Sequence, residues 1–152
     1  MPGFTTEIAV LHGRPDAYAT ESVLSIYREI FGIIDEEKFH LRMQNAEDLL
    51  ILFAQVEGAL AGFKVGYRLE EGVFYSWIGG VRATYRKHGI ARMLMERQHE
   101  WCKMHNYRVV RTKTYNRWKN MLLLNLRCGF EITGTVEKAG SDLQIVLEKK
   151  LF

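Results

Sequence analysis

The sequence predicts an α/β protein in which helices flank a mixed β-sheet. β-prone runs and amphipathic helical runs follow one another in the order β-α-α-β-β-β-α-β-α-β-β. Two tight-turn signals, Glu57-Gly58 and Glu70-Glu71-Gly72, join three successive β-prone runs into a meander. This order gives six to seven strands and about four helices.

The first part of the chain contains one strand and two helices. Residues Thr5 to Leu11 are predicted to form a strand, and Ala19 to Phe31 carry apolar residues at helical spacing. Gly32 is expected to end that helix. A second helix is expected over Asp35 to Asn45, with Asp35 as its N-cap.

The rest of the chain alternates between strands and helices. The meander consists of Leu49 to Val56, Ala59 to Leu69 and Val73 to Val81. The elements expected after it are a long helix over Gly89 to Asn106, a strand over Tyr107 to Thr114, a helix over Asn116 to Cys128 closed by Gly129, and strands over Glu131 to Val136 and Asp142 to Leu151. On the long helix, the spacing of His99 and His105 indicates a solvated face.

The bulk composition is that of a globular protein. The 152 residues are expected to form a single domain, 1–152, because no Pro-rich or Gly/Ser-rich stretch offers a linker. Hydrophobic residues make up 47% and charged residues 26%, which is far from the signature of disorder. The net charge of +3 suits an anionic small molecule and is weak for a dedicated nucleic-acid binder.

The cysteines and the hydropathy pattern predict the compartment. Cys102 and Cys128 lack the spacing of a disulfide framework or of metal ligands, so we expect reduced thiols and no metal. Neither a signal peptide nor an apolar run long enough for a membrane span is recognisable. A cytoplasmic protein is expected.

The segment that carries chemistry is the basic loop between the strand ending at Val81 and the helix opening at Gly89. A helix N-terminus presents unpaired N–H groups and the positive end of the helix dipole, which together favour a phosphate. Gly89 lets the backbone approach such a ligand closely, and Ala91 is small. Positive charge around the loop comes from Arg86, Lys87, His88 and Arg92. Alone, this pattern equally fits a basic turn that caps an ordinary helix.

Its surroundings favour the first interpretation. Arg86, Gly89 and Ala91 match the pattern Arg/Gln-x-x-Gly-x-Gly/Ala, so the stretch resembles motif A of the GNAT acyltransferase superfamily. The resemblance extends over about residues 73–136, where Cys128 is followed by the Gly-Phe pair that typically closes this part of the family's sequence.

The resemblance implies an N-acetyltransferase that uses acetyl-CoA as co-substrate and acts on a primary amine by direct attack. It implies a mostly antiparallel sheet with one splayed parallel pair, and CoA in the gap between those two strands. Gly79 would direct its N–H at the thioester carbonyl. The expected cofactor contacts are Val81, Arg82, Ala83, Arg86, Lys87, His88, Gly89, Ile90, Ala91, Arg92, Asn116 and Asn120. We expect Gly79-Gly80 to mark a bulge that opens the strands, or simple backbone clearance.

The sequence departs from the family at the acid and the base. Asn125 stands where many relatives carry the Tyr that protonates the departing thiolate, and an amide can only hydrogen-bond there. Tyr115 is our substitute acid, although a surface or core aromatic is the commoner role for such a residue. Tyr75 stands where some relatives place a Glu base, and Glu70 or Glu71 could accept a proton through water. Either Asn116 or Asn120 is expected to cap its helix.

Other functions remain open from the sequence. A nucleic-acid-binding module is motivated by basic residues interleaved with aromatics, namely Arg108, Arg111, Lys113, Arg117 and Lys119 with Tyr107, Tyr115 and Trp118. Asn125 also fits a CoA-binding regulator without turnover. The sequence does not identify the acceptor amine, which could belong to a small molecule or a peptide. It also leaves open whether the protein forms a homodimer. Acidic residues that could favour a cationic amine are Glu29, Asp35, Glu36 and Glu37, although a solvated helix start explains them equally well.

Overall fold

Seven strands form one sheet in the order β1-β2-β3-β4-β5-β7-β6 in the computed structural model, which describes residues 5–152. The strands are β1 (Thr6–His12), β2 (Leu50–Val56), β3 (Ala59–Glu70), β4 (Val73–Val81), β5 (Val109–Tyr115), β6 (Glu131–Val136) and β7 (Gln144–Lys150). The helices are α1 (Ala17–Phe31), α2 (Glu36–Asn45), α3 (Ile90–Met104) and α4 (Lys119–Arg127), with a 3-10 turn at Ala83–Tyr85. The predicted order and the mixed, mostly antiparallel sheet are confirmed.

Local signals fix the ends of the first two helices. The carboxylate of Asp16 accepts a hydrogen bond of 2.8 Å from the N–H of Ala19, so α1 begins two residues earlier than the apolar pattern indicated. Gly32 ends it with a φ of 83°, as predicted. Asp35 caps α2 through a 3.1 Å bond from the N–H of Lys38, also as predicted.

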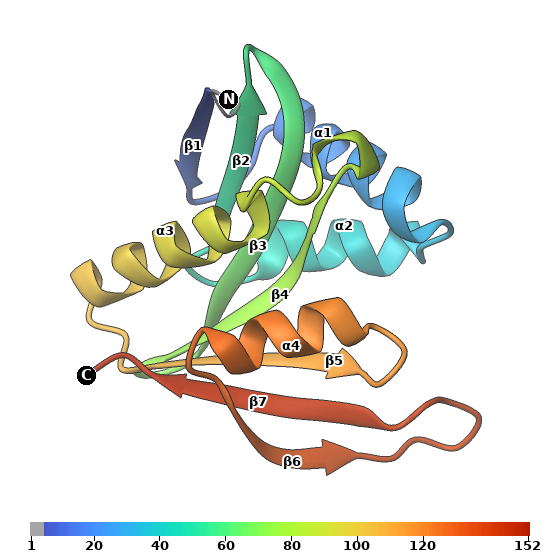
Figure 1. Ribbon diagram of the computed structural model, residues 1–152, viewed down its shortest axis with the longest axis vertical. Coiled ribbons are helices and arrows are strands. Elements are labelled where there is room, and N and C mark those ends of the chain that lie inside the picture. Colours follow the sequence, from blue (N-terminus) through green and yellow to red (C-terminus); the bar gives the residue numbers. More distant parts are fainter. Residues whose placement is uncertain (1–4) are drawn as a thin grey trace.

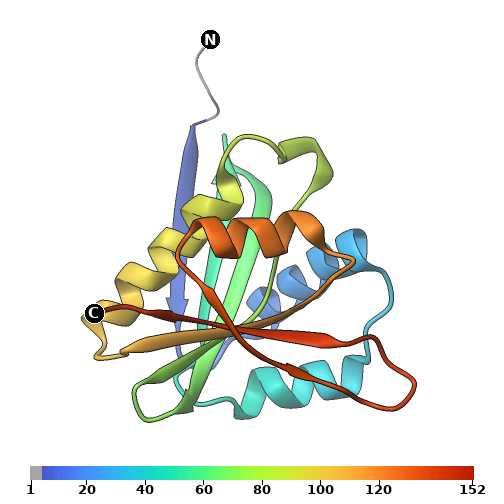
Figure 2. The ribbon, with the colours of Figure 1, turned by 60° about the horizontal axis from the view of Figure 1, so that its bottom comes forward.

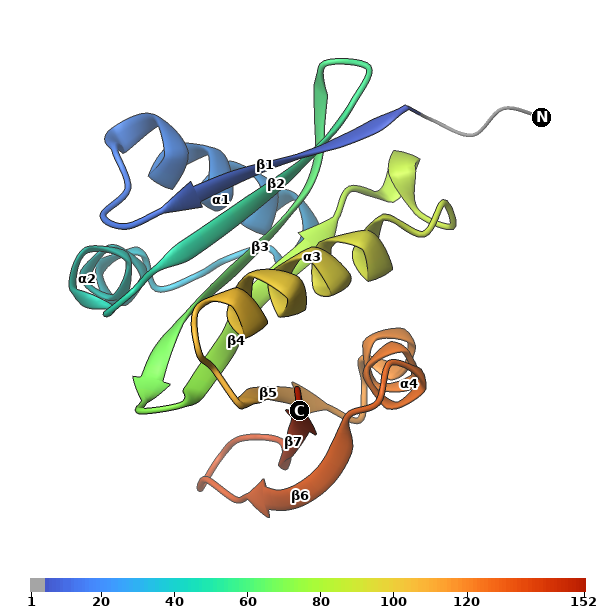
Figure 3. The ribbon, with the colours of Figure 1, turned by 90° about the vertical axis from the view of Figure 1, so that its left-hand side faces the viewer.

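The helices cover both faces of the sheet. Figure 3 shows α1 and α2 on one side of β1 to β4 and α3 on the other, with α4 next to β5 on the side of α3. Strand β2, which lies next to the edge strand β1, is buried on both faces. Leu50 and Leu52 pack in the core beneath α3, whereas Ile51 and Phe53 pack beneath α1 and α2. Figure 2 shows α4 lying along the β5, β7 and β6 portion of the sheet. None of the helices in the described part is both long and apolar enough to cross a membrane.

The parallel pair β4 and β5 separates partway along its length. Pairing runs from Val73 opposite Val109 to Ser76 opposite Thr112, and there it ends, although β4 continues to Val81. In Figure 1 the two strands diverge from their shared end. The register of β4 against β3 shifts at the same level, leaving Trp77 without a partner. The bulge therefore lies at Trp77, and our expectation of a bulge at Gly79-Gly80 is wrong.

Gly80 provides backbone clearance, which was our alternative interpretation of Gly79-Gly80. A Cβ on Gly80 would approach the Cδ1 atom of Ile30 to 2.8 Å, so this glycine lets α1 pack closely against β4. A Cβ on Gly79 would point to the opposite face, where it would lie 3.3 Å from Cγ of Lys64.

Candidate functional site

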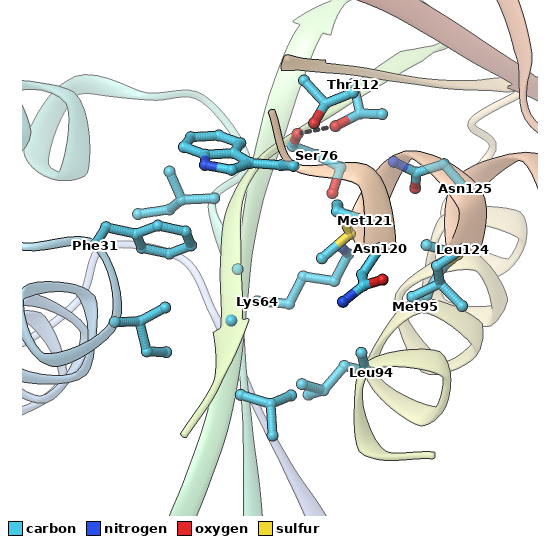
Figure 4. Close-up of a pocket in the computed structure, with 18 of the residues that line it drawn as sticks. Phe31, Lys64, Ser76, Leu94, Met95, Thr112, Asn120, Met121, Leu124 and Asn125 are labelled. Carbon is cyan, nitrogen blue, oxygen red and sulfur yellow. Dashed lines mark hydrogen bonds between the residues drawn. The ribbon is translucent and has the colours of Figure 1, made fainter. Parts of the chain in front are cut away.

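A cavity of about 690 Å³ occupies the opening between β4 and β5. Trp77, Gly79 and Val81 form one wall, and Thr112 and Thr114 form the facing strand. Helices contribute further lining residues from α1 (Tyr27, Ile30, Phe31), α3 (Ala91, Leu94, Met95) and α4 (Lys119, Asn120, Met121, Leu124, Asn125). Figure 4 shows Lys64, Asn120 and Asn125 at this cavity, below the hydrogen bond that joins Ser76 to Thr112.

The backbone of β4 directs two donors into the opening. The N–H of Arg82 donates to the carbonyl oxygen of Ala61 on β3 at 2.8 Å. Because successive N–H groups of a strand point in opposite directions, Gly80 also faces β3, while Gly79 and Val81 direct their N–H groups towards the gap. Gly79 and Val81 are the two positions on β4 at which the sequence predicted ligand contacts.

The start of α3 forms the basic end of the cavity. Gly89 is the N-cap residue with a φ of 77°, and a Cβ there would meet nothing within 4 Å. Arg86 and Lys87 line the cavity, and the Nε–H of Arg86 donates to the carbonyl oxygen of Val81 at 3.1 Å. The unpaired N–H groups of the first helical turn begin at Ile90. Together they make a cationic, donor-rich anion site.

Other residues of the predicted loop point elsewhere. The guanidinium of Arg82 donates to Glu29 at 2.8 Å and to the carbonyl oxygen of Leu60 at 3.0 Å, on the side of α1. Arg92 pairs with Glu96 one turn along α3, at 2.9 Å. Ile90 is buried in the core beneath α3. Ala83, His88 and Gly89 are also outside the cavity lining.

The predicted asparagines divide between the cavity and the surface. Asn120 and Asn125 line the cavity from α4, and Asn125 is only 4% exposed. Asn116 is exposed and does not line it. The N-cap of α4 is Trp118, which makes no side-chain capping bond, so the expectation that an asparagine caps this helix is wrong.

Tyr115 lies at the end of β5 but does not line the cavity. Its hydroxyl accepts a long hydrogen bond of 3.4 Å from Nε2 of Gln144, and its ring stacks edge-on against Trp118. Burial raises the pKa of Tyr27 and that of Tyr75, the latter to about 12, and the nearby Tyr115 hydroxyl adds to both shifts. The Tyr115 hydroxyl therefore lies near Tyr27 and Tyr75.

The charge of the lining is uniform. Among the described residues that line the cavity no Asp or Glu occurs, and the cationic residues are Lys64, Arg86, Lys87, Lys113, Arg117 and Lys119. Glu70 and Glu71, our candidate bases, lie at the β3–β4 turn and are outside it. Such a cavity attracts an anion with several negative charges.

Sequence reasoning missed Lys64. A signal was present, because Lys64 interrupts an otherwise apolar or small run, Ala61 to Gly66, within a strand predicted to be buried. A cation in such a strand requires either a buried partner or a polar space, and here it faces the cavity.

The acidic residues near α1 and α2 are occupied by local partners. Glu29 pairs with Arg82, and Glu36 pairs with Arg28. Asp35 accepts the capping bond of α2. Since three of the four carboxylates in this cluster already have a donor, the argument that it selects a cationic amine is weakened.

The basic and aromatic residues proposed for nucleic acid do not form a free stripe. Tyr107 is buried, and its hydroxyl donates to Asp48. Arg111 pairs with Glu148 at 2.5 Å, and Arg117 pairs with Asp142. Three residues of this basic and aromatic pattern, Tyr107, Arg111 and Arg117, therefore already have partners within the protein.

His99 corrects another expectation, because it is buried rather than solvated. It is 5% exposed, and its Nδ1 atom lies 3.3 Å from Nζ of Lys149. Burial, reinforced by Lys149 and Lys64, lowers the pKa of His99 to about 3, so the ring is neutral at pH 7. No cluster of three or more potential metal ligands occurs within residues 5–152.

Comparisons with known proteins agree with this geometry. The model of the "Acetyltransferase (GNAT) family" matches residues 20–130. No curated protein matches the sequence. Among solved structures, the ribosomal-protein-S18-alanine N-acetyltransferase from Escherichia coli superposes with a TM-score of 0.77 at 12% identity, covering 94% of both chains.

Two further structures resemble the chain. Ard1 from Thermoplasma volcanium has a TM-score of 0.76 at 18% identity, covering 95% of this chain and 99% of its own. NAA60 from Arabidopsis thaliana, in complex with acetyl-CoA, has a TM-score of 0.71 at 19% identity, covering 93% of this chain and 98% of its own. At these identities the likeness is one of fold.

Proposed function

Because this chain belongs to the acetyltransferase (GNAT) family, we propose that it transfers the acetyl group of acetyl-CoA to a primary amine. One observation carries the proposal. The gap between β4 and β5 opens into a cavity that combines unpaired strand donors with a cationic lining free of carboxylates among the described residues. CoA carries phosphates at one end and a hydrogen-bonding pantetheine arm at the other, and this cavity complements both.

The phosphates bind at the start of α3 in this proposal. The N–H groups of its first turn and the side chains of Arg86 and Lys87 supply the donors. The left-handed backbone at Gly89 leaves space for close approach. In this proposal the residues of the loop that do not line the cavity contribute to CoA binding through their backbone; they are Arg82, Ala83, His88, Ile90 and Arg92.

The acetyl group lies against β4 in this proposal. The amine nitrogen attacks the thioester carbon, and negative charge builds on the carbonyl oxygen. A donor placed in advance stabilises that oxygen by about 3 kcal/mol in other enzymes, and the N–H of Gly79 faces the gap. Val81, two residues further along β4, pairs with an amide of the pantetheine arm. Holding amine and thioester together supplies much of the remaining acceleration.

The acceptor enters from the face of α1 and α2 in this proposal. Aromatic side chains surround that entrance. The ring centroids of Tyr27 and Phe31 are 4.8 Å apart, and those of Phe31 and Trp118 are 5.5 Å apart. Trp77 lines the same side. We propose an acceptor amine on an apolar or aromatic body, either a small molecule or a peptide. Peptide N-termini belong in the screen because the Escherichia coli protein is named for acting on an alanine of a ribosomal protein.

The test is a screen of amines and short peptides with detection of released CoA thiol. Acetyl transfer to at least one amine is expected, together with a higher Tm in the presence of acetyl-CoA. An increase in Tm without thiol release from any amine would instead favour a CoA-binding regulator, for which Asn125 is the supporting residue. The free thiols Cys102 and Cys128 fit a reducing compartment, so we propose the cytoplasm as the location.

A further inference from the structure

Lys64 is a cation placed beside the predicted oxyanion donor. It pairs with Gly79 across β3 and β4, and its Cγ atom lies 3.3 Å from where a Cβ of Gly79 would be. From there its side chain extends behind β4 towards α4, as Figure 4 shows. Within the described residues, no hydrogen bond or ion pair engages its ammonium group. Lys64 therefore presents a donor to the cavity.

The surroundings of Lys64 disfavour its charge. Burial lowers the pKa of Lys64 to about 8, and the nearby Cys128 thiol only partly opposes this. A further titratable neighbour is His99 on α3, which is neutral at pH 7 and whose Nδ1 atom lies 3.3 Å from Nζ of Lys149 on β7. On β4, Gly79 contributes only backbone. Lys64 is thus mostly charged at neutral pH but releases its proton readily.

The proposed reaction needs a proton donor near the departing sulfur. On α4, the cavity is lined by Lys119, Asn120, Met121, Leu124 and Asn125. Lys119 is exposed at the first position of the helix, and the other four side chains are not acids. Tyr115 lies at the other face and outside the cavity. Among the lysines that line the cavity, Lys64 is the one that pairs with Gly79 and extends from β3 towards α4.

We propose that the Lys64 ammonium protonates the departing CoA sulfur, an inference that rests on the proposed acetyltransferase function. The amine nitrogen forms a bond to the carbonyl carbon, and the C–S bond breaks with its electron pair remaining on sulfur. A proton of Lys64 Nζ passes to that sulfur and gives the CoA thiol. The acceptor nitrogen loses its proton to water, and solvent reprotonates Lys64. The cation also attracts the thiolate before the proton moves.

The lowered basicity of Lys64 suits this step. A general acid is most effective when its pKa lies near the working pH, and a pKa of about 8 meets that condition. An ordinary solvated lysine holds its proton too tightly.

Two variants separate the proton from the charge. Lys64→Met removes both, while Lys64→Arg keeps the charge on a group that cannot be deprotonated in proteins. We expect Lys64→Met to lower kcat by about 100-fold, with the Kd for acetyl-CoA changed by less than about threefold. Lys64→Arg is expected to lose most of the same activity. Lys64→Met should fold, with a Tm at pH 7 equal to or above that of the wild type, because a half-buried charge without a partner among the described residues is removed.

A second readout does not depend on turnover. The thiol of bound CoA is titrated by its thiolate absorbance, and the complex with desulfo-CoA is subtracted to remove Cys102 and Cys128. In the wild type and in Lys64→Arg, the bound thiol should ionise at lower pH than free CoA. In Lys64→Met this shift should disappear, because the neighbouring cation is gone.

The outcomes distinguish the two proposals. If the wild type transfers acetyl groups and Lys64→Met has the same kcat, the role of Lys64 is overturned, whereas the proposed acetyltransferase function stands. Wild-type protein that transfers to no amine overturns the transferase itself. If Lys64→Met binds CoA and desulfo-CoA equally more weakly, with no change in the thiol titration, Lys64 is not the general acid. Its role would then be to bind CoA. If mass spectrometry detects acetylation of Lys64 during turnover, the general-acid proposal is overturned, because Lys64 would then act as a nucleophile.

Discussion

The hydroxyl of Thr112 donates a 2.9 Å hydrogen bond to the carbonyl oxygen of Ser76, at the last position where β4 and β5 pair. Beyond this bond the strands separate, and the bulge at Trp77 turns β4 away at the same level. A side chain thus links the two strands where they part. The bond helps to set where the cavity begins.

We expect Thr112→Val to weaken both the fold and CoA binding. The valine has nearly the same shape but cannot donate, so the free energy of unfolding should fall by about 1 kcal/mol. The Kd for acetyl-CoA should rise severalfold because the gap is less firmly defined. Urea unfolding and calorimetric titration measure the two effects. Thr112→Ser, which keeps the hydroxyl, is the matched control, and unchanged affinity in Thr112→Val would show that the gap does not depend on this bond.

A pair of substitutions at Gly89 tests the anion site at the start of α3. Aspartate and asparagine have similar shapes and both tolerate the left-handed backbone that Gly89 adopts. Gly89→Asp adds a negative charge next to the proposed phosphates, whereas Gly89→Asn does not. We expect the rise in Tm caused by acetyl-CoA to be mostly lost in Gly89→Asp and largely kept in Gly89→Asn, as measured by thermal unfolding with and without ligand.

The two Gly89 variants also provide their own control. Their Tm values without acetyl-CoA should be similar, because a Cβ at this position meets nothing within 4 Å. Equal stabilisation of both variants by acetyl-CoA would mean that the phosphates bind elsewhere in the protein.

The sequence predicted the features that depend on neighbours along the chain. Asp35 caps α2 and Gly32 ends α1 because capping needs only adjacent backbone groups. The position of the bulge was not predictable, because Trp77 loses its partner through the register of β4 against β3. The apolar run around it carries no local signal for that register.

The same limit explains the errors within the candidate site. Alternation along β5 placed Thr112 and Thr114 on one face and Tyr115 on the other, but the sequence alone did not show which face α4 covers. Likewise, helical spacing did not show that His99 would be buried. The role of Lys64 also depends on its pairing with Gly79 from another strand. Such facts arise from contacts between distant segments.

His99 should make the protein sensitive to acid. Its pKa is lowered to about 3 in the folded protein, while an unfolded histidine titrates near 6.5. Below about pH 6.5 the unfolded chain therefore binds a proton that the folded protein does not, and stability falls as the pH falls. This contribution is fully present above pH 6.5 and is lost progressively towards pH 3.

The variant His99→Gln isolates this effect. Between pH 6.5 and 5 the wild type should lose up to about 1.4 kcal/mol of unfolding free energy per pH unit more than the variant. Urea unfolding at several pH values measures both slopes. Lys149, whose Nζ atom lies 3.3 Å from Nδ1 of the ring, is present in both proteins, so the comparison changes only the side chain at position 99. Parallel slopes would show that His99 is solvated in solution.

Tyr115→Phe tests the acid that the sequence first favoured, and it should have little effect. The hydroxyl lies outside the cavity, its hydrogen bond to Gln144 is long at 3.4 Å, and the ring contact with Trp118 would survive. We expect kcat to change by less than about threefold, because a general acid contributes about 100-fold or more and a packing tyrosine does not. The Kd for acetyl-CoA, measured by direct titration since KM need not equal it, should stay the same. Run beside Lys64→Met in one assay, the variant decides between the two acids: a loss of about 100-fold in Tyr115→Phe with unchanged affinity would assign the proton to Tyr115 and remove it from Lys64.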